Sequence, residues 1–242
     1  MLYQQTQPKG ILAEYIDAYW TASSTQGKTT EEKVLPDGCV DIILNTGVDC
    51  RVESENFTMK HGKMYLVGPM TRYKIMLMHR TNHLQGVRFK PGAIGVFCPD
   101  IKPDGLTDQT VELEDTWVYG IKKLNFKTDN LNDFFAYKLQ NNLPAVLSIT
   151  RDIQQQKGNA RIAELAARHY HTKRQIERIF KKHVGITAKE LSNITRYREA
   201  LSMIQQRNGL SLEDIAYACG YYDHSHLTRD ILHYTGSLPS QL

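Results

Sequence analysis

The chain has 242 residues, of which 41% are hydrophobic and 23% are charged. These values are typical of globular domains and exclude a fibrous repeat or a wholly disordered chain. No apolar run approaches the roughly 18 residues of a membrane-spanning helix, and the first residues lack the pattern of a secretory leader. The four cysteines form no C-x-x-C pair, as is ordinary in a reduced protein. We therefore expect a cytoplasmic protein of one large domain or two ordinary ones, with no membrane partner.

Net charge divides unevenly along the chain. Residues 1–142 hold 16 Lys and Arg against 17 Asp and Glu, whereas residues 143–242 hold 14 against 9. Six of the nine histidines also fall in the second part. A basic module joined to a neutral one favours a nucleic-acid partner for the basic part.

The first part of the sequence is typical of β-strands. Val40–Leu44 is a short apolar run, and Tyr73, Ile75 and Leu77 stand at every second position, as in a half-buried strand. His83–Phe89 follows and ends at a Lys-Pro-Gly turn. Several short strands separated by Pro and Gly predict a small sandwich or barrel.

Helical patterns come next, around Glu112–Leu124 and Leu131–Leu139. From Leu143 to the end the sequence has almost no strand pattern. We place the domain boundary near Asn141–Pro144. This predicts an α+β protein with a β-rich domain over residues 1–142 and an all-α domain over residues 143–242.

An internal repeat is the strongest feature of the second part. Each copy starts with a short helix that carries an i, i+3, i+4 apolar stripe, and a second helix follows after a tight turn. The second helices correspond at one offset of 51 residues, through the pairs Thr172 and Asp223, Ile176 and Leu227, Arg178 and Arg229, Phe180 and Ile231, and Gly185 and Gly236. Two short helices joined in this way predict a helix-turn-helix, whose second helix lies in the major groove of DNA.

Residues suited to helix ends flank these helices. An N-cap side chain accepts hydrogen bonds from free amides at the start of a helix, and a left-handed glycine ends one. We expect these roles for Thr172 with Gln175, Ser211 with Asp214, Asp223, Gly185 and Gly236.

The outward face of each second helix carries polar residues that can reach DNA. Arginine suits bidentate contact with guanine, and Glu177 can accept from a cytosine amino group. Arg178 and Arg229 occupy equivalent positions, and one of them could instead form an internal salt bridge. The candidate DNA-binding residues are Lys173, Arg174, Glu177, Arg178, Lys181, His224, Ser225, Thr228 and Arg229, with Lys182, Arg196 and Arg198 as further candidates for phosphate contact.

A long helix is predicted between the two copies, over Ala188–Gln206. At about 1.5 Å per residue it would span nearly 30 Å. Successive major grooves on one side of B-DNA lie roughly 34 Å apart. One protomer could therefore read a bipartite site.

Residues 143–242 resemble the DNA-binding region of AraC/XylS-type bacterial transcription regulators. The resemblance rests on the first copy, on Arg196, Ala200 and Ile204 in the spacer, and on the tail segments Ile215-Ala216, Cys219-Gly220-Tyr221, Ser225–Arg229 and Tyr234–Ser240. It implies two helix-turn-helix motifs, double-stranded promoter DNA as the target, and activation through contact with RNA polymerase.

Three segments of the first part, Leu35–Ile42, Gly68–Tyr73 and Gly86–Gly92, resemble the sensor-like N-terminal domain of one AraC subgroup. This resemblance implies a barrel-like, cupin-like domain that binds a small-molecule effector, forms a homodimer, or does both. A small barrel can enclose one ligand among apolar and polar side chains. Candidate ligand-binding residues are Trp20, Tyr73, Met76, Met78, His83 and Arg88, although each also suits an ordinary core or surface position.

Metal and catalytic sites are not expected. His79 with His83, and His224 with His226, have metal-like spacing, but no cysteine or carboxylate completes a familiar ligand set. The scattered cysteines do not supply the cluster that a zinc-dependent DNA-repair methyltransferase needs. No phosphate-binding, dinucleotide-binding or nucleophile-elbow motif is present. We expect no cofactor and no enzyme activity.

Three hypotheses follow from the sequence. The first is a ligand-responsive transcription regulator. The second is a regulator whose N-terminal domain contacts only protein, either a second copy or another partner. The third is a cupin-type barrel enzyme with a DNA-binding tail.

Overall fold

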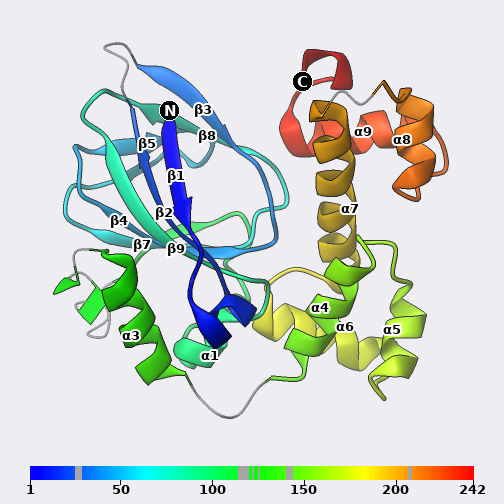
Figure 1. Cartoon of the computed structure of the whole chain (residues 1–242), viewed down its shortest axis with the longest axis horizontal. Helices are drawn as coiled ribbons and strands as arrows, with labels where there is room; N and C mark the ends of the chain where they lie inside the picture. Colours follow the sequence, from blue (N-terminus) through cyan, green and yellow to red (C-terminus); the bar gives the residue numbers. More distant parts are fainter. Residues whose placement is uncertain (25–28, 114–119, 122, 125, 140–143, 207–208) are drawn as a thin grey trace.

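The structure is a computed structural model that describes residues 1–24, 29–113, 120–121, 123–124, 126–139, 144–206 and 209–242. It has a β-rich half and a helical half that lie side by side, with the long helix α7 (Ala188–Gln205) along the boundary between them (Figure 1). This arrangement has the mixed α+β architecture that the sequence predicts.

Within the described ranges, ten strands form two antiparallel sheets. The larger sheet has the strand order β1-β2-β9-β4-β7-β10, and the smaller one has the order β3-β8-β5-β6. The strands of the larger sheet are β1 (Leu2–Thr6), β2 (Ile16–Ser23), β9 (His83–Phe89), β4 (Val40–Asn45), β7 (Met64–Val67) and β10 (Thr110–Leu113). Those of the smaller sheet are β3 (Thr30–Val34), β8 (Lys74–Met78), β5 (Cys50–Val52) and β6 (Phe57–Met59).

The centre of the larger sheet is buried on both faces, and β4 shows this best. Every residue of β4 is buried. Ile42 and Leu44 pack in a cluster with the helices α1 (Ile94–Phe97) and α3 (Thr128–Lys138), whereas Ile43 packs in the cluster shared with the smaller sheet. A strand covered on both faces needs apolar residues at successive positions. This explains the apolar run, interrupted at Asp41, that predicted β4.

The strand predictions at residues 40–44 and 83–89 are confirmed by β4 and β9, and the alternation at residues 73–77 falls on β8. The helix expected over Leu131–Leu139 is confirmed by α3. The helix expected from Glu112 is wrong at its start, because Glu112 and Leu113 lie in β10 and pair with Tyr65 and Met64 of β7. Residues 114–119 and 122, also in that prediction, lie outside the described residues.

The helical half is built from α7 and five shorter helices around one core. These are α4 (Val146–Gln155), α5 (Ile162–Arg168), α6 (Lys173–His183), α8 (Leu212–Ala218) and α9 (His224–Thr235). The helix predicted over residues 188–206 is confirmed by α7. The domain boundary predicted at residues 141–144 falls mostly on residues 140–143, which lie outside the described residues.

Candidate nucleic-acid interface and interdomain cavity

The first helix-turn-helix is formed by α5 and α6. Thr172 caps α6, since its hydroxyl accepts from the Gln175 amide at 3.2 Å and the Gln175 side chain accepts from the Thr172 amide at 2.7 Å. Ile176 and Phe180 of α6 are fully buried in the helical core. Gly185 follows the helix with a φ of +89° and donates to Phe180 O. The predicted capping box and glycine end are confirmed.

The second helix-turn-helix repeats this construction with α8 and α9. Ser211 and Asp214 form a capping box on α8, and Asp223 accepts from the His226 amide at 2.7 Å to cap α9. Leu227 and Ile231 are fully buried at the positions equivalent to those in α6. Gly236, with a φ of +65°, ends the helix. Tyr73 of the β-rich half packs so closely on Gly236 that an added Cβ would lie 2.4 Å from its ring.

The faces of α6 and α9 opposite the core are polar and exposed. Lys173, Arg174, Glu177, Arg178 and Lys181 are all exposed on α6. On α9 the exposed residues are His224, Ser225 and Arg229, while Thr228 is half-buried and donates to His224 O. Neither Arg178 nor Arg229 forms an ion pair with any described residue. The internal salt bridge considered for one of them is therefore not found in the described part of the chain.

Three of the basic residues considered for DNA contact also bind protein groups. Lys181 lies 3.4 Å from the Asp104 carboxylate of the β-rich half. Arg196 stacks on the Tyr221 ring, with 4.5 Å to its centroid, and pairs with Asp230 of α9. Arg198 pairs with Asp37 across the boundary between the halves. The phosphate role considered for Arg196 does not fit its position, because the side chain is largely buried.

Helix α7 separates the two helix-turn-helix units, which lie at its opposite ends (Figure 1). Its 18 residues give a length of about 27 Å at about 1.5 Å per residue. Leu191, Ile194 and Leu201 of α7 are buried and belong to the core cluster of the helical half. Helix α7 therefore sets the distance between α6 and α9.

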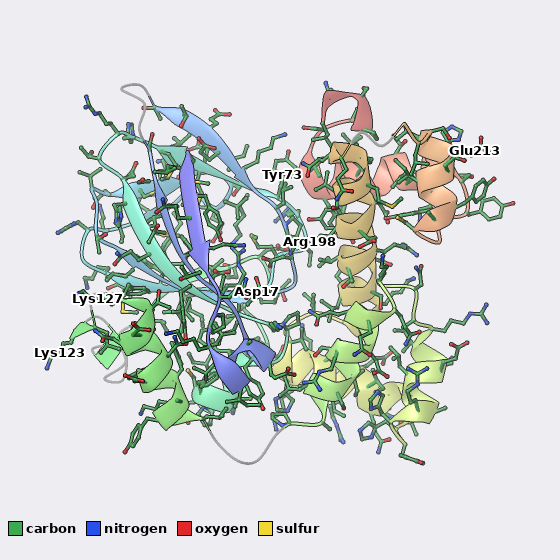
Figure 2. The ribbon with its side chains drawn as sticks, viewed as in Figure 1. Asp17, Tyr73, Lys123, Lys127, Arg198 and Glu213 are labelled. Carbon is green, nitrogen blue, oxygen red and sulfur yellow. The ribbon has the colours of Figure 1, made fainter. Side chains whose placement is uncertain are left out.

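A cavity of about 370 Å³ lies between the two sheets and is closed on one side by α7. Its apolar wall comes mostly from the β-rich half and includes Trp20, Met59, Met70, Met76, Met78 and Leu84. The α7 side is formed by Tyr197, Arg198, Leu201, Ser202 and Gln205. One concave site thus touches both halves of the molecule. Figure 2 shows Arg198 on the side of α7 that faces the sheets.

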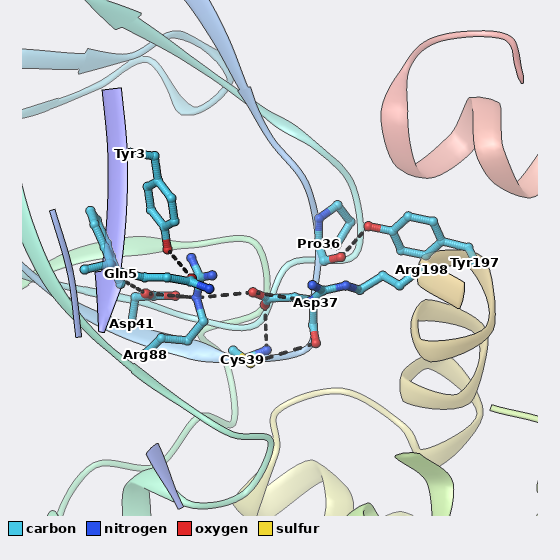
Figure 3. Close-up of polar contacts among 10 residues, drawn as sticks. Tyr3, Gln5, Pro36, Asp37, Cys39, Asp41, Arg88, Tyr197 and Arg198 are labelled. Carbon is cyan, nitrogen blue, oxygen red and sulfur yellow. Dashed lines mark hydrogen bonds and ion pairs between the residues drawn. The ribbon is translucent and has the colours of Figure 1, made fainter. Parts of the chain in front are cut away.

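A cluster of charged side chains lines this cavity (Figure 3). Arg88 Nε lies 3.2 Å from the Asp37 carboxylate and 3.3 Å from the Asp41 carboxylate. Trp20 Nε1 donates to Asp41 at 2.6 Å. Burial raises the pKa of Asp41 to about 6, and the positive charge of Arg88 opposes this rise. The Tyr197 hydroxyl of α7 donates to Pro36 O, so the loop that carries Asp37 is tied to α7.

The structure brings four of the six candidate ligand-binding residues to this cavity, namely Trp20, Met76, Met78 and Arg88. The other two lie elsewhere. Tyr73 packs on the end of α9 (Figure 2), and His83 Nδ1 lies 2.6 Å from the Thr46 hydroxyl. Asp37, Asp41 and the α7 residues were not candidates. Asp37 and Asp41 belong to the segment at residues 35–42 that resembles a sensor domain. That resemblance is the sequence feature that could have pointed to them as cavity residues.

The β-rich half also contacts the C-terminal end of each recognition helix. Lys33 Nζ of β3 donates to Thr235 O at 3.0 Å and to Ser237 Oγ at 2.9 Å, at the end of α9. Thr107 Oγ1 donates to Gly185 O at 2.8 Å, after the end of α6. The β-rich half therefore contacts the ends of both α6 and α9.

Two further findings concern the described residues alone. They contain no group of three or more His, Cys, Asp or Glu side chains placed to hold a metal ion. No helix among them has the length and apolar character needed to cross a membrane.

Two helix-turn-helix units on one rod define a DNA-binding domain. Residues 165–242 match the family described as helix-turn-helix domain, and residues 4–112 match a domain of unknown function, DUF6597. The chain thus has an AraC-type helix-turn-helix domain at its C-terminus behind this N-terminal domain, as in a DNA-binding transcription regulator. No curated protein sequence matches the chain.

Solved structures of ToxT share this fold. ToxT from Vibrio cholerae O395 is 13% identical, with 99% of this chain and 96% of that chain covered and a TM-score of 0.50. An apo ToxT variant from Vibrio cholerae strain SCE256 is 12% identical, with 98% of each chain covered and a TM-score of 0.52. At this level of identity the similarity concerns the fold alone.

Proposed function

We propose that this chain is a transcription regulator that reads a bipartite promoter site with α6 and α9 and responds to a small effector in the interdomain cavity. The observation that carries the proposal is the repeat itself. Two recognition helices with the same caps and the same buried positions present polar faces at opposite ends of one rod.

The residue types on those faces suit DNA. Arg174, Arg178 and Arg229 are long enough to reach guanine edges in the major groove, and Glu177 can accept from cytosine. Lys173 and Lys181 suit phosphate contact at the ends of α6, and His224, Ser225 and Thr228 suit contacts near the start of α9. Base edges are read mainly by the N-terminal part of a recognition helix, where most of these residues stand.

An effector role fits the position of the cavity. Its wall is apolar with a few polar groups, and its volume lies in the lower part of the range of small-molecule sites. Because α7 forms part of the wall, a bound molecule would contact the element that spaces the two recognition helices. We further propose that the protein acts in the cytoplasm as an activator that contacts RNA polymerase, with the homodimer as an additional assembly.

Selection of binding sites from a random pool of DNA duplexes tests the bipartite reading. The full chain should recover sequences with two short preferred blocks, about 10 base pairs apart from centre to centre. The variant Arg80→Ala, which changes an exposed arginine in the turn between β8 and β9, should recover the same sequences. Recovery of a single block, or of no preferred sequence, would contradict the proposal.

A further inference from the structure

The charged groups that line the interdomain cavity already have ion-pair or hydrogen-bond partners within the protein. Lys74 pairs with Glu55, and Arg198 with Asp37. Lys33 is held by the end of α9, and the amino group of Met1 lies 2.9 Å from Glu32. Arg88 stands between the two carboxylates that face the cavity. Every lining cation among the described residues thus already has a partner within the protein, although the partners of Lys33 are carbonyl and hydroxyl oxygens, not a carboxylate.

An added charge would be costly in this position. Asp37 and Asp41 carry two negative charges that Arg88 and Arg198 balance. Burial already raises the pKa of Asp41, which indicates that the surroundings disfavour further negative charge. A cation would have to compete with both arginines for the same carboxylates. Burying an ion without its own partner costs far more than burying a neutral polar group.

One polar feature of the wall is still available for a ligand. Arg88 makes its ion pairs through Nε, and its Nη1 and Nη2 groups donate no hydrogen bond to any residue that the structure describes. Figure 3 shows the Arg88 side chain between Asp41 and Asp37. Both Nη groups can donate hydrogen bonds to an acceptor atom of a ligand, but neither can accept a hydrogen bond from it. Much of the remaining wall is apolar and rich in methionine, which adapts to irregular shapes.

We propose that the cavity binds an uncharged, mainly apolar molecule whose single acceptor group, such as a ketone, ester or lactone carbonyl, accepts from the Nη edge of Arg88. Its apolar body lies against Met59, Met76 and Met78. This inference rests on the proposed effector role of the cavity and specifies the chemistry of the effector.

Three probes with the same alkyl chain and different heads test the charge preference. Isothermal titration calorimetry of the full chain at pH 8 compares decan-2-one, decanoate and decylammonium, each kept below its aggregation limit. Decan-2-one should bind at least about tenfold more tightly than either ion, a difference of about 1.4 kcal/mol. Equal or tighter binding of an ion, or no binding of decan-2-one, would overturn the proposal.

The variant Arg88→Lys tests the hydrogen bond. It keeps a cation beside Asp37 and Asp41 but lacks the planar pair of Nη donors. The affinity for decan-2-one should fall about tenfold, as expected for loss of a hydrogen bond to a charged group. The matched control Arg151→Lys, at an exposed pair with Glu14, should keep the wild-type affinity. Equal affinity in both variants would place the carbonyl elsewhere, and if Arg88→Lys fails to fold, the ranking of the three probes still decides.

Measuring the affinity of the ligand-free chain for DNA distinguishes a failure of this ligand proposal from a failure of the proposed DNA-binding function. Sequence-specific DNA binding together with a preference for decanoate would overturn only the neutral-ligand proposal. Absence of specific DNA binding would overturn the proposed function, whatever the probes do.

Discussion

The two helix-turn-helix units share a scaffold and differ in charge. Both recognition helices begin at a side-chain cap, bury two apolar residues at the same positions and present an exposed arginine at the same position. Yet α6 carries five lysines and arginines against one glutamate, whereas α9 carries one arginine against one aspartate. In both helices the residues that pack in the core are separate from the charged residues on the exposed face. We infer that α6 supplies most of the electrostatic attraction and that α9 contributes mainly sequence preference.

The largest expected effect comes from the shared core. Phe180→Ala and Ile231→Ala should each destabilise the protein, by about 3–5 and about 2–5 kcal/mol, because each leaves a cavity in a fully buried site. Urea unfolding followed by circular dichroism measures both. The neighbouring Leu232→Ala removes a 46% exposed side chain and should cost under about 0.5 kcal/mol. A similarly small cost for Ile231→Ala would mean that the second unit is not built like the first.

The next effect concerns base reading by the two exposed arginines. Arg178→Ala and Arg229→Ala should each lose about 1–3 kcal/mol of discrimination, and each at a different half of the selected site. Fluorescence anisotropy with duplexes mutated in one half at a time measures this loss. Loss of preference at the same bases in both variants would break the bipartite reading.

Removal of a helix cap should cost less. Thr172→Ala and Ser211→Ala should each reduce stability by about 1 kcal/mol, because each leaves helix amides without an acceptor. Thr172→Ser keeps the hydroxyl and should stay close to wild type. Unequal costs for the two alanine variants would show that the caps of α6 and α8 do not contribute equally to stability.

The smallest effect tests the difference in charge. Affinity for DNA should fall as salt rises, and Lys173→Ala on α6 should reduce the magnitude of the log–log slope by about 0.9, because the variant neutralises one phosphate fewer. Ser225→Ala on α9 should leave the slope unchanged, since the serine is uncharged. If both variants kept the wild-type slope, Lys173 would not bind a phosphate.

Local patterns were enough to predict the repeat and several strands. The caps at Thr172, Ser211 and Asp223 depend on neighbours three residues away, and the buried pairs of α6 and α9 depend on helical spacing. The apolar residues at successive positions of β4 reflect the burial of this strand on both faces. In each case the physical cause lies within a few residues, so the sequence shows it directly.

The cavity could not be predicted in the same way, because its wall joins residues far apart in the chain. Arg88 and Asp37 are 51 positions apart, and Asp37 meets Arg198 only when the two halves pack together. Tyr73 precedes β8 and alternates with Ile75 and Leu77, but nothing in that pattern shows that its ring lies against Gly236. The strand β10, which contains Glu112, also depends on a distant partner, the strand β7. Pairing over long distances leaves no local pattern.

The contact of Lys33 with the end of α9 has a consequence for the independence of the two halves. The last carbonyls of a helix find no amide donors within the helix itself and must accept from groups outside it. Here an amino group from the first 40 residues supplies that donor to a helix that ends 202 positions later. The tail of this recognition helix is therefore completed by another part of the protein. A truncated or transplanted version would begin to unwind at that end first.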